Sequence, residues 1–584
     1  MQTSPQPTAA APLMTHRQIM FVIFGLMAGM FLSALDQTIV GTSMRTIADD
    51  LDGMALQAWV TTAYLIVSCI STPIYGKLSD IFGRRPLFLI AITIFLIGSL
   101  LAGMANSMYE LAAFRAIQGL GAGGLMALPL TIMGDMLAPR ERAKYQGYFL
   151  AVFGISSVIG PLIGGVLSGS ESILGITGWR WVFLVNIPIG IVALVIVLRY
   201  LHIPHFARPV RIDWWGATTV ILAAVPLLLV AEQGRVWGWN SPAAIACYAV
   251  GVLGIVGFIL AERMMGDDAL IPLTLFRSQT FSMATVLGVL VGFGMFGAMM
   301  TVPLYLQLVN GATPTQSGFL MLPMIGGLMI SSIASGQIIA RTGQYRIFPT
   351  IGTAFMSAGF LTLTFLNADR PVWFTMIGML LIGLGLGQLM QTLTIASQNS
   401  VGQRDMGVAT SASTFFRQIG GTLGTAVLFS VLFTRIPDTL RAAFSDPVAL
   451  ASVRAAASDP TVQADPANAT ILGMLSNPAS VGGALDGDTS FLSTSDPRLT
   501  HPFLVGFNDA TITVFWVSLA VVLVAFVLSF FLKAPPLRET SAMQEAANED
   551  AAHQAQLAAD RMGALIEPGT GTREIELPAV PAAR

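Results

Sequence analysis

The segment Gly76-Lys-Leu-Ser-Asp-Ile-Phe-Gly-Arg-Arg-Pro-Leu87 joins two long apolar runs, and it decides how the rest of the chain is interpreted. Glycine permits a tight turn between two helices. Asp80 and Arg84 stand four residues apart, so their side chains can pair with each other or with neighbouring helix ends. The segment therefore predicts a short charged turn between two apolar helices.

The composition indicates which solvent surrounds those helices. Hydrophobic residues make up 54% of the 584 residues and charged residues only 11%, whereas soluble domains carry roughly 25% charged residues. So few charges cannot cover a water-facing surface, and most of the chain is expected to face lipid. The net charge of −2 comes without a basic or acidic block, so no nucleic-acid partner is expected. Cys69 and Cys247 lie in apolar stretches and are expected to be packing residues.

Apolar runs long enough to cross a bilayer recur along the chain. A spanning helix needs about 20 mainly apolar residues. The predicted spans are 18–43, 55–75, 87–106, 108–134, 146–170, 181–201, 214–232, 243–262, 281–308, 314–340, 347–367, 371–397, 408–433 and 505–532. The sequence therefore predicts an all-α polytopic membrane protein with fourteen transmembrane helices.

The distribution of Lys and Arg predicts the orientation, because cytoplasmic loops are enriched in these residues. With a cytoplasmic N-terminus, the inner loops hold fourteen of them: Lys77, Arg84, Arg85, Arg140, Arg142, Lys144, Arg199, Arg208, Arg211, Arg263, Arg277, Arg341, Arg346 and Arg404. The short outer loops hold four: Arg45, Arg180, Arg235 and Arg370. Both termini are therefore predicted to be cytoplasmic, and the segment 434–504 to be external.

An internal repeat divides the chain. Gly76 and Gly83 recur as Gly336 and Gly343, an offset of 336 − 76 = 260 residues. The same offset lays spans 1–6 on spans 9–14 and leaves spans 7 and 8 unpaired. We therefore expect a cytoplasmic tail (1–17), a six-helix half (18–202), an inserted two-helix linker (203–280), a second six-helix half (281–533, including 434–504) and a cytoplasmic tail (534–584). Parallel halves of this kind place a substrate site between them near the midplane.

The charged turn resembles the signature loop of the major facilitator superfamily. This resemblance implies that Asp80 and Arg84 form a charge cluster with an acidic residue at the inner end of the fourth helix, a place that Asp135 occupies. It also implies that the cluster latches an outward-open state through the start of the thirteenth helix. The expected role of these three residues is conformational.

Further segments resemble the fourteen-helix drug:proton antiporter family, the EmrB/QacA type. They are Leu35–Val40, Trp179–Gly190, Asp213–Gly216, Trp237–Trp239 and Arg417–Gly421, whereas Arg115–Gly123 resembles the fourth-helix motif of the whole superfamily. Gly154, Gly160, Pro161, Gly164 and Gly165 resemble the antiporter motif of the fifth helix, which is associated with exporters. One departure is that the first-helix motif continues as Gly41-Thr-Ser-Met-Arg45-Thr, which is more polar than is common in the family and suggests an altered external gate or substrate range.

Charges inside spanning helices need a reason, because each costs roughly 2.5–3.5 kcal/mol on insertion scales. Asp36 and Arg115 each lie about seven residues, roughly 10 Å, from the outer end of the predicted helices 1 and 4, so the two can pair. Burial favours a neutral carboxyl group and a nearby arginine favours a charged one, and a group between these effects can exchange protons. Asp36 and Arg115 are therefore the predicted proton-coupling pair, and a permanent structural ion pair is the alternative.

Other charged residues have weaker claims to a role. Arg417, near the middle of the thirteenth helix, is expected to bridge the halves or to join a charge relay, with Asp509 as an accessory member. Glu110, Asp213, Glu232 and Glu262 lie near helix ends, where capping or contact with the membrane interface is the simpler expectation. The predicted substrate pocket is lined by Gln37, Thr38, Gln118, Phe293, Tyr305, Gln307, Gln388 and Gln391, and each of these is equally explained by core or lipid-facing packing.

The favoured interpretation is a proton-driven exporter of hydrophobic or cationic amphipathic compounds in a bacterial inner membrane. Its partners are protons, small amphipathic substrates and the lipid bilayer. One alternative is an exporter of lipids or envelope precursors that uses 434–504 to meet an envelope partner, and another is a sensor or scaffold that does not transport. The sequence contains no Gly-x-x-x-x-Gly-Lys-Ser/Thr loop and no His/Cys cluster, so neither ATP, a metal nor another cofactor is expected, and no enzymatic reaction.

Overall fold

The structure is a computed structural model that describes residues 16–51, 53, 56–201, 211–402, 405–476 and 491–538, together with Ser541, Gln544 and Gln556. Most of the two predicted tails, 1–17 and 534–584, lies outside the described residues, as do Arg208 and Arg404.

The first half of the chain forms a helical group within residues 16–201. Its helices are α1 (His16–Asp50), α2 (Gln57–Phe82), α3 (Arg84–Gly103), α4 (Met108–Met136), α5 (Pro139–Ser168), α6 (Trp181–Leu184) and α7 (Asn186–Tyr200). Between α5 and α6 lie a short antiparallel hairpin, β1 (Ser172–Ile173) and β2 (Ile176–Thr177), and the 3-10 turn η2 (Gly178–Arg180).

Two further helices precede the second half. They are α8 (Trp214–Trp237) and α9 (Pro242–Met265), which are followed by the 3-10 turns η3 (Gly266–Asp268) and η4 (Leu273–Arg277). The second half comprises α10 (Gln279–Leu308), α11 (Pro314–Leu320), α12 (Leu322–Thr342), α13 (Ile347–Thr364), α14 (Val372–Asn399), α15 (Met406–Ser445) and α21 (Pro497–Ser529). Between α15 and α21 stand α16 (Pro447–Ala457), α17 (Pro460–Ala464), η6 (Pro466–Asn468), α18 (Ala469–Ser476) and α20 (Phe491–Thr494).

The helices have the number and length that the predicted fold requires. In the described part of the chain, 13 helical stretches are long and apolar enough to cross a membrane, with α6–α7 and α11–α12 each counted as one. The helix α2 is not one of these 13, but it is 26 residues long and packs along α4, so it completes the first group of six. The fold is therefore two six-helix halves with two inserted helices, as predicted from the repeat.

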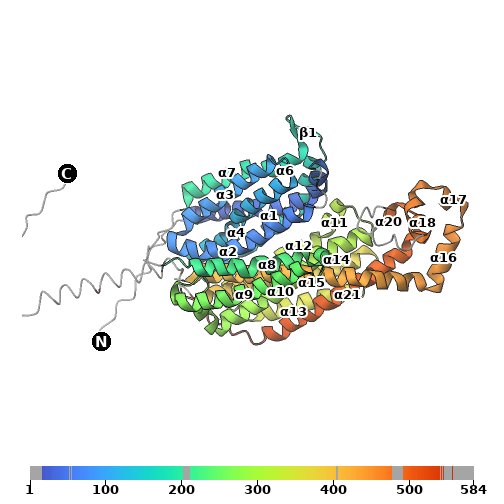
Figure 1. The fold of residues 1–584 in the computed structure, drawn as a ribbon. Helices are drawn as coiled ribbons and strands as arrows, with labels where there is room; N and C mark the ends of the chain where they lie inside the picture. Colours follow the sequence, from blue (N-terminus) through green and yellow to red (C-terminus); the bar gives the residue numbers. More distant parts are fainter. Residues whose placement is uncertain are drawn as a thin grey trace, which may run out of the picture.

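Figure 1 shows how these parts lie. The α1–α7 group and the α10–α21 group lie side by side with their helices roughly parallel, and α8 runs along the seam between them. The helix α8 packs against α2 of the first half and α15 of the second, so the inserted pair contacts both halves. We call the end of the bundle that carries the α2–α3 turn the Asp80 end, and the end that carries β1–β2 the hairpin end.

Several helices are longer than the apolar runs that predicted them. The predicted first span stopped at residue 43, but α1 continues to Asp50 because a buried face with Ile47 and Ala48 continues beyond the apolar run. Trp179 Nε1 donates to Asp50 Oδ2 at 2.7 Å and fixes this end. In the same way α5 begins at Pro139, seven residues before the predicted start.

Two predicted spans contain a break. The predicted span 181–201 is the short helix α6 followed by α7, with the change at Val185. The predicted span 314–340 is α11 followed by α12, with the change at Met321, one residue before Leu322-Pro323. Proline has no backbone N–H to continue a helix ladder, so a break before it is expected. In both cases the two pieces together still have the length of one span.

The predicted external segment 434–504 is largely helical. The helix α15 runs to Ser445 and α21 begins at Pro497, so both extend well past the predicted edges at 433 and 505. We call the part between them, residues 446–496, the cap; its described helices lie beyond the hairpin end of the bundle (Figure 1). Buried Val453, Val462 and Ile471 belong to the same hydrophobic cluster as the α15 and α21 core, so the cap is packed onto these two helices.

Candidate functional site

The most buried charged pair in the first half is Asp36 of α1 and Arg115 of α4. Arg115 Nη1 donates to Asp36 Oδ2 at 2.5 Å, and the exposed fractions of the two residues are 1% and 0%. Gln118 Nε2 and Asn186 Nδ2 both donate to Asp36 Oδ1, at 2.9 and 2.8 Å. The carboxylate therefore accepts three hydrogen bonds from two other helices, and one of them comes from a charged donor.

The arginine of this pair is also held by an aromatic ring. The guanidinium carbon of Arg115 lies 3.9 Å from the centre of the Tyr64 ring, a cation–π arrangement. Tyr64 is in turn hydrogen-bonded to Ser33 of α1, with 3.0 Å between the two hydroxyl oxygens. Because α1, α2, α4 and α7 all contribute, a change in the charge of Asp36 affects contacts between four helices of the first half.

The structure corrects the predicted depth of Asp36 while it places the pair together. Because α1 ends at Asp50, Asp36 lies 50 − 36 = 14 residues from that end, near the middle of the helix. Arg115 lies seven residues after Met108, the start of α4, as predicted. The two helices end at different heights, so an estimate made from apolar run lengths gave the right pairing with the wrong depth for Asp36.

Asn186, Tyr64 and Ser33 belong to this network and were not predicted. Asn186 lies in the Trp179–Gly190 segment, at the first residue of α7 after the break at Val185. It is completely buried and also donates to Ser99 Oγ at 2.9 Å. A polar amide in the middle of an otherwise apolar span was the available sequence signal. Gln118, which is predicted to line a substrate pocket, is also a member of this network.

The second charged group is the predicted cluster at the Asp80 end. Arg84 Nε donates to Asp135 Oδ2 at 2.6 Å, and Arg84 Nη1 pairs with Asp80 Oδ1. Asp80 Oδ2 also accepts a hydrogen bond of 3.1 Å from the backbone N–H of Val408, in the first turn of α15. The three predicted residues are therefore together, and one of them contacts the helix named in the prediction.

Two glycines permit this contact between α2 and α15. A Cβ atom added at Gly76 would lie 1.9 Å from Ser411 Oγ, and one added at Gly407 would lie 2.4 Å from Asp80 Oδ1. Both distances are too short for any side chain larger than hydrogen. Gly76 lies inside α2 and is therefore required for the approach of the two halves, whereas the turn to α3 is made by Gly83, with a φ of 94°.

A second contact between the halves at this end was not predicted. Arg142 of α5 donates to the side-chain oxygen of Gln398 on α14, and also to Gly134 O at 3.0 Å. Gln398 Nε2 donates to Thr410 Oγ1 of α15 at 2.8 Å. Gln391, a predicted pocket residue, donates to Ala143 O at 2.8 Å instead. In the described part of the chain, all hydrogen bonds between the two halves lie at the Asp80 end.

The glycines of the fifth-helix motif face two different neighbours. A Cβ atom added at Gly160 would lie 2.0 Å from Thr38 Oγ1, and one at Gly164 would lie 3.0 Å from Ile39 O, so this part of α5 packs on α1 next to Asp36. A Cβ atom at Gly154 would lie 2.2 Å from Ile325 on α12, in the other half. Pro161 is inside α5, and Gly165 has open space around it. The motif thus connects the helix of Asp36 with the second half.

The remaining predicted pocket residues lie in separate places. Thr38 donates to Leu35 O and Ser156 O, so it ties α1 to α5. Tyr305 donates to Asn508 Oδ1 on α21 at 3.2 Å, and Gln307 donates to Ser317 Oγ at 3.1 Å. Gln37 and Phe293 are partly buried, and Gln388 is buried with a side-chain oxygen that has no donor. These contacts describe packing, and the pocket assignment stays a prediction.

The two predicted relay residues are not in contact in the described part of the chain. Arg417 is 8% exposed, whereas Asp509 is exposed and accepts from Asn508 Nδ2 at 3.1 Å. Among the acidic residues at helix ends, Glu110 and Asp213 cap α4 and α8 as expected. Glu262 is buried instead, where its Oε2 accepts from Ile271 N at 3.0 Å.

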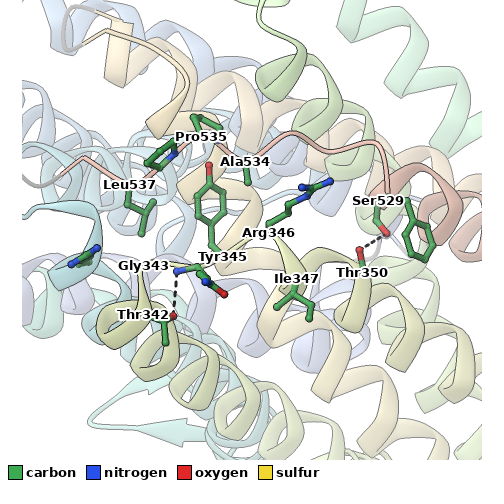
Figure 2. A pocket seen from close by; sticks show the side chains of 14 residues that line it. Thr342, Gly343, Tyr345, Arg346, Ile347, Thr350, Ser529, Ala534, Pro535 and Leu537 are labelled. Carbon is green, nitrogen blue, oxygen red and sulfur yellow. Dashed lines mark hydrogen bonds between the residues drawn. The ribbon is translucent and has the colours of Figure 1, made fainter.

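A cavity of about 760 Å³ lies at the Asp80 end, where Arg140 of α5 in the first half lines it together with residues of the second half and the segment after α21. Figure 2 shows its lining, which includes Tyr345, Arg346 and Leu537, with a hydrogen bond of 3.1 Å between Ser529 and Thr350 at one side. None of the predicted pocket residues lines this cavity.

Fold and site together define a multi-pass membrane protein whose two helical halves meet through charged contacts at one end. Residues 26–425 match the family model described as Major Facilitator Superfamily, and the chain belongs to this transporter family. It is 37% identical over 538 residues to the multidrug transporter protein MdtP of Bacillus subtilis, covering 91% of this chain and 96% of that one.

Two further comparisons agree on family and fold. A tetracycline resistance determinant of Streptomyces rimosus is 37% identical over 337 residues, which cover 57% of this chain and 94% of that protein. The solved structure of the proton:xylose symporter XylE aligns with a TM-score of 0.54 at 14% identity, covering 91% of this chain and 99% of that one. At this identity the structural match shows the shared fold alone.

Proposed function

We propose that this chain is a proton-coupled exporter that exchanges protons for hydrophobic or cationic amphipathic compounds by alternating access. The observation that carries the proposal is the completely buried carboxylate of Asp36, held by Arg115, Gln118 and Asn186. A charged group in a membrane helix is costly and marks a functional site by default. Relatives that are named multidrug and tetracycline resistance transporters support the substrate class.

Asp36 is the proton-coupling residue of this proposal, and Arg115 is its charged partner. Protonation removes the charge that attracts Arg115, so the ion pair and the cation–π contact on Tyr64 weaken together. Movement of α1 relative to α4 then becomes easier. Because Gly160 and Gly164 pack α5 on α1 next to this site, the same movement reaches α5, which also contacts the second half through Gly154.

In the proposed alternating-access cycle, the contacts at the Asp80 end close one side of the transporter. Asp80, Arg84 and Asp135 together with Val408, and Arg142 with Gln398, hold the halves closed at this end. We propose that this end faces the cytoplasm, as the excess of Lys and Arg in its loops predicts, and that closure here corresponds to the outward-facing state. The proposed boundaries of the halves, the linker and the tails are those predicted from the repeat. The proposed location of the protein is a bacterial inner membrane.

Proton release on substrate binding tests this function directly. The purified protein in weakly buffered detergent solution is mixed with a cationic dye such as rhodamine 123, and a pH indicator follows the solution. Dye binding is expected to release protons. The number of protons released is expected to be greatest at starting pH values at which Asp36 is protonated before the dye binds. Absence of release with every compound that binds would contradict proton exchange at this site.

The cap supports a second candidate function, export of a lipid or envelope precursor. The cap is packed on α15 and α21 through Val453, Val462 and Ile471, so it is built to hold a fixed position at the hairpin end. That end is the external one in the proposed orientation, where a partner in the envelope would meet it. Replacing residues 446–496 with a short flexible linker is expected to leave dye export intact under the first function and to abolish export under the second.

A further inference from the structure

Four arginines are buried in the part of the bundle that the structure describes, and one of them, Arg417, lacks a partner. Arg84 is paired with Asp80 and Asp135. Arg115 is paired with Asp36, and Arg142 is hydrogen-bonded to Gln398 and to the carbonyl oxygen of Gly134. Arg417 of α15 is 8% exposed, and it makes no hydrogen bond, ion pair or ring contact with any residue that the structure describes. Burial without a partner disfavours the charged form of any group, so a guanidinium in this position requires an anion from elsewhere.

The position of Arg417 on α15 indicates where that anion binds. Thr410 of the same helix accepts from Gln398, whose amide also donates to Leu130 O on α4 of the first half, so this face of α15 meets the other half. Arg417 follows Thr410 by seven residues, which is nearly two helical turns and about 10 Å along the axis. It therefore lies on the same face, deeper in the bundle than the contacts that close the Asp80 end.

The glycine opposite Arg417 keeps the side chain in this place. A Cβ atom added at Gly292 of α10 would lie 2.2 Å from the backbone oxygen of Arg417 and 3.2 Å from its Cγ. The absence of a side chain at Gly292 thus lets the apolar stem of Arg417 lie directly against α10.

We propose that Arg417 binds the anionic group of a substrate, so that the exporter accepts amphipathic organic anions as well as cations. The ligand chemistry is a carboxylate or phosphate on an apolar body, supplied either by a soluble compound or by a lipid headgroup. This inference rests on the proposed export function and adds a second charge preference to it: Asp36 in the first half attracts cations and protons, and Arg417 in the second half attracts anions. A role as a bridge or relay residue does not require selectivity for anions.

The test compares two dyes that share a ring system and differ in charge. Binding of carboxyfluorescein, an anion, and rhodamine 123, a cation, is measured by fluorescence anisotropy with the purified wild type, R417Q and R417K. R417Q is expected to weaken carboxyfluorescein binding at least tenfold and to change rhodamine 123 binding less than threefold, while R417K keeps most of the anion binding. R435Q is the matched control, because Arg435 is an exposed arginine on the same helix.

Further measurements separate the two sources of the anion. Short-chain phosphatidylglycerol and phosphatidylcholine are compared as competitors of carboxyfluorescein. Competition by phosphatidylglycerol alone assigns the site to lipid headgroups, and competition by neither assigns it to soluble anions.

Several outcomes overturn the inference. They are equal weakening of both dyes by R417Q, unchanged anion binding in R417Q, and failure of the wild type to bind any anionic probe. If R417Q does not fold, measurements on the wild type and R417K still decide whether the protein binds an anionic probe. Export of rhodamine 123 driven by a pH gradient is measured alongside, because its absence would contradict the exporter function itself and not the assignment of Arg417.

Discussion

Asp36 is held by donors that the sequence only partly predicts. Its pairing with Arg115 follows from the rule that a charge within a membrane helix needs an opposite charge. Asn186 and Tyr64 are absent from that argument because their contribution depends on how α7 and α2 are rotated, and the sequence spacing does not give that rotation. The sequence thus predicts the charged members of the network, and packing decides its neutral members.

The neutral donor Asn186 has a measurable contribution to stability. N186A removes one of the three hydrogen bonds to Asp36 and leaves Ser99 without its amide partner. Loss of one buried partner typically costs about 1–3 kcal/mol. The unfolding temperature of N186A in detergent is expected to fall by several degrees, whereas N240A, at an exposed asparagine, is expected to unfold as the wild type does. Equal unfolding temperatures for N186A and the wild type would contradict this role.

At the scale of helices, the sequence predicts which helices exist better than it predicts where each helix begins and ends. Apolar runs predict where the chain is inside lipid, and helices continue beyond lipid wherever a buried face continues, as in α1 beyond residue 43 and α15 beyond residue 433. The predicted distance of seven residues between Asp36 and the end of its helix was wrong for this reason. The glycines of the charged turn were predicted to make a turn, whereas the contact of Gly76 with Ser411 depends on the approach of two helices far apart in sequence.

The close approach of α2 and α15 gives a prediction with a matched control. G76A places a methyl group where Ser411 now lies and is expected to separate the halves at the Asp80 end, because helix backbones must move apart to admit it. G326A is the control, since a Cβ atom at this helical glycine meets nothing within 4 Å. The distance between spin labels at Phe82 and Gln344 is expected to increase or broaden in G76A and to stay unchanged in G326A.

Two outcomes would contradict that account. A distance distribution in G76A identical to that of the wild type would show that the α2–α15 contact does not hold the halves closed. A change of the same size in G326A would mean that any added methyl group on these helices has the effect, because alanine itself favours helices over glycine by roughly 0.5–1 kcal/mol.

The cap gives a pH-dependent prediction. A hydrogen bond from the Thr461 side chain lowers the pKa of Asp459, and one from the Arg498 side chain lowers the pKa of Asp496. A pKa that is lower in the folded state contributes stability above the ordinary value of about 3.9, and this stability is lost as the pH falls through the folded-state pKa. The protection of amides in residues 446–496 against hydrogen exchange, measured relative to the intrinsic exchange rate at each pH, is therefore expected to be constant between pH 7 and 5 and to fall below about pH 4.

The control for this prediction removes the shared partner. In R498Q the pKa values of Asp459 and Asp496 return toward their ordinary values. The loss of protection against hydrogen exchange is therefore expected to begin at a higher pH in R498Q than in the wild type. The same onset in both proteins would show that these two carboxyl groups do not control the stability of the cap.

At the scale of the whole molecule, the repeat and the charged turn predicted the architecture. Two six-helix halves with two inserted helices follow from an offset in a few glycines, because a duplicated fold keeps its turns. The contact between Arg142 and Gln398 and the fold of the cap were not predicted, because they depend on how the finished halves meet and on short helices without a membrane-length apolar run. The Asp36–Arg115 pair and the charged contacts at the Asp80 end together lead to one central claim, that Asp36 couples protons to transport.

The most direct test of that claim is dye uptake into inverted vesicles with an acidic lumen, where an exporter pumps inward, with D36N compared with the wild type. The wild type is expected to transport rhodamine 123 at a rate that rises with the gradient. D36N is expected to lose the gradient-driven component by at least tenfold while it still binds the dye. Full gradient-driven transport by D36N would contradict the assignment of Asp36 as the proton-coupling residue.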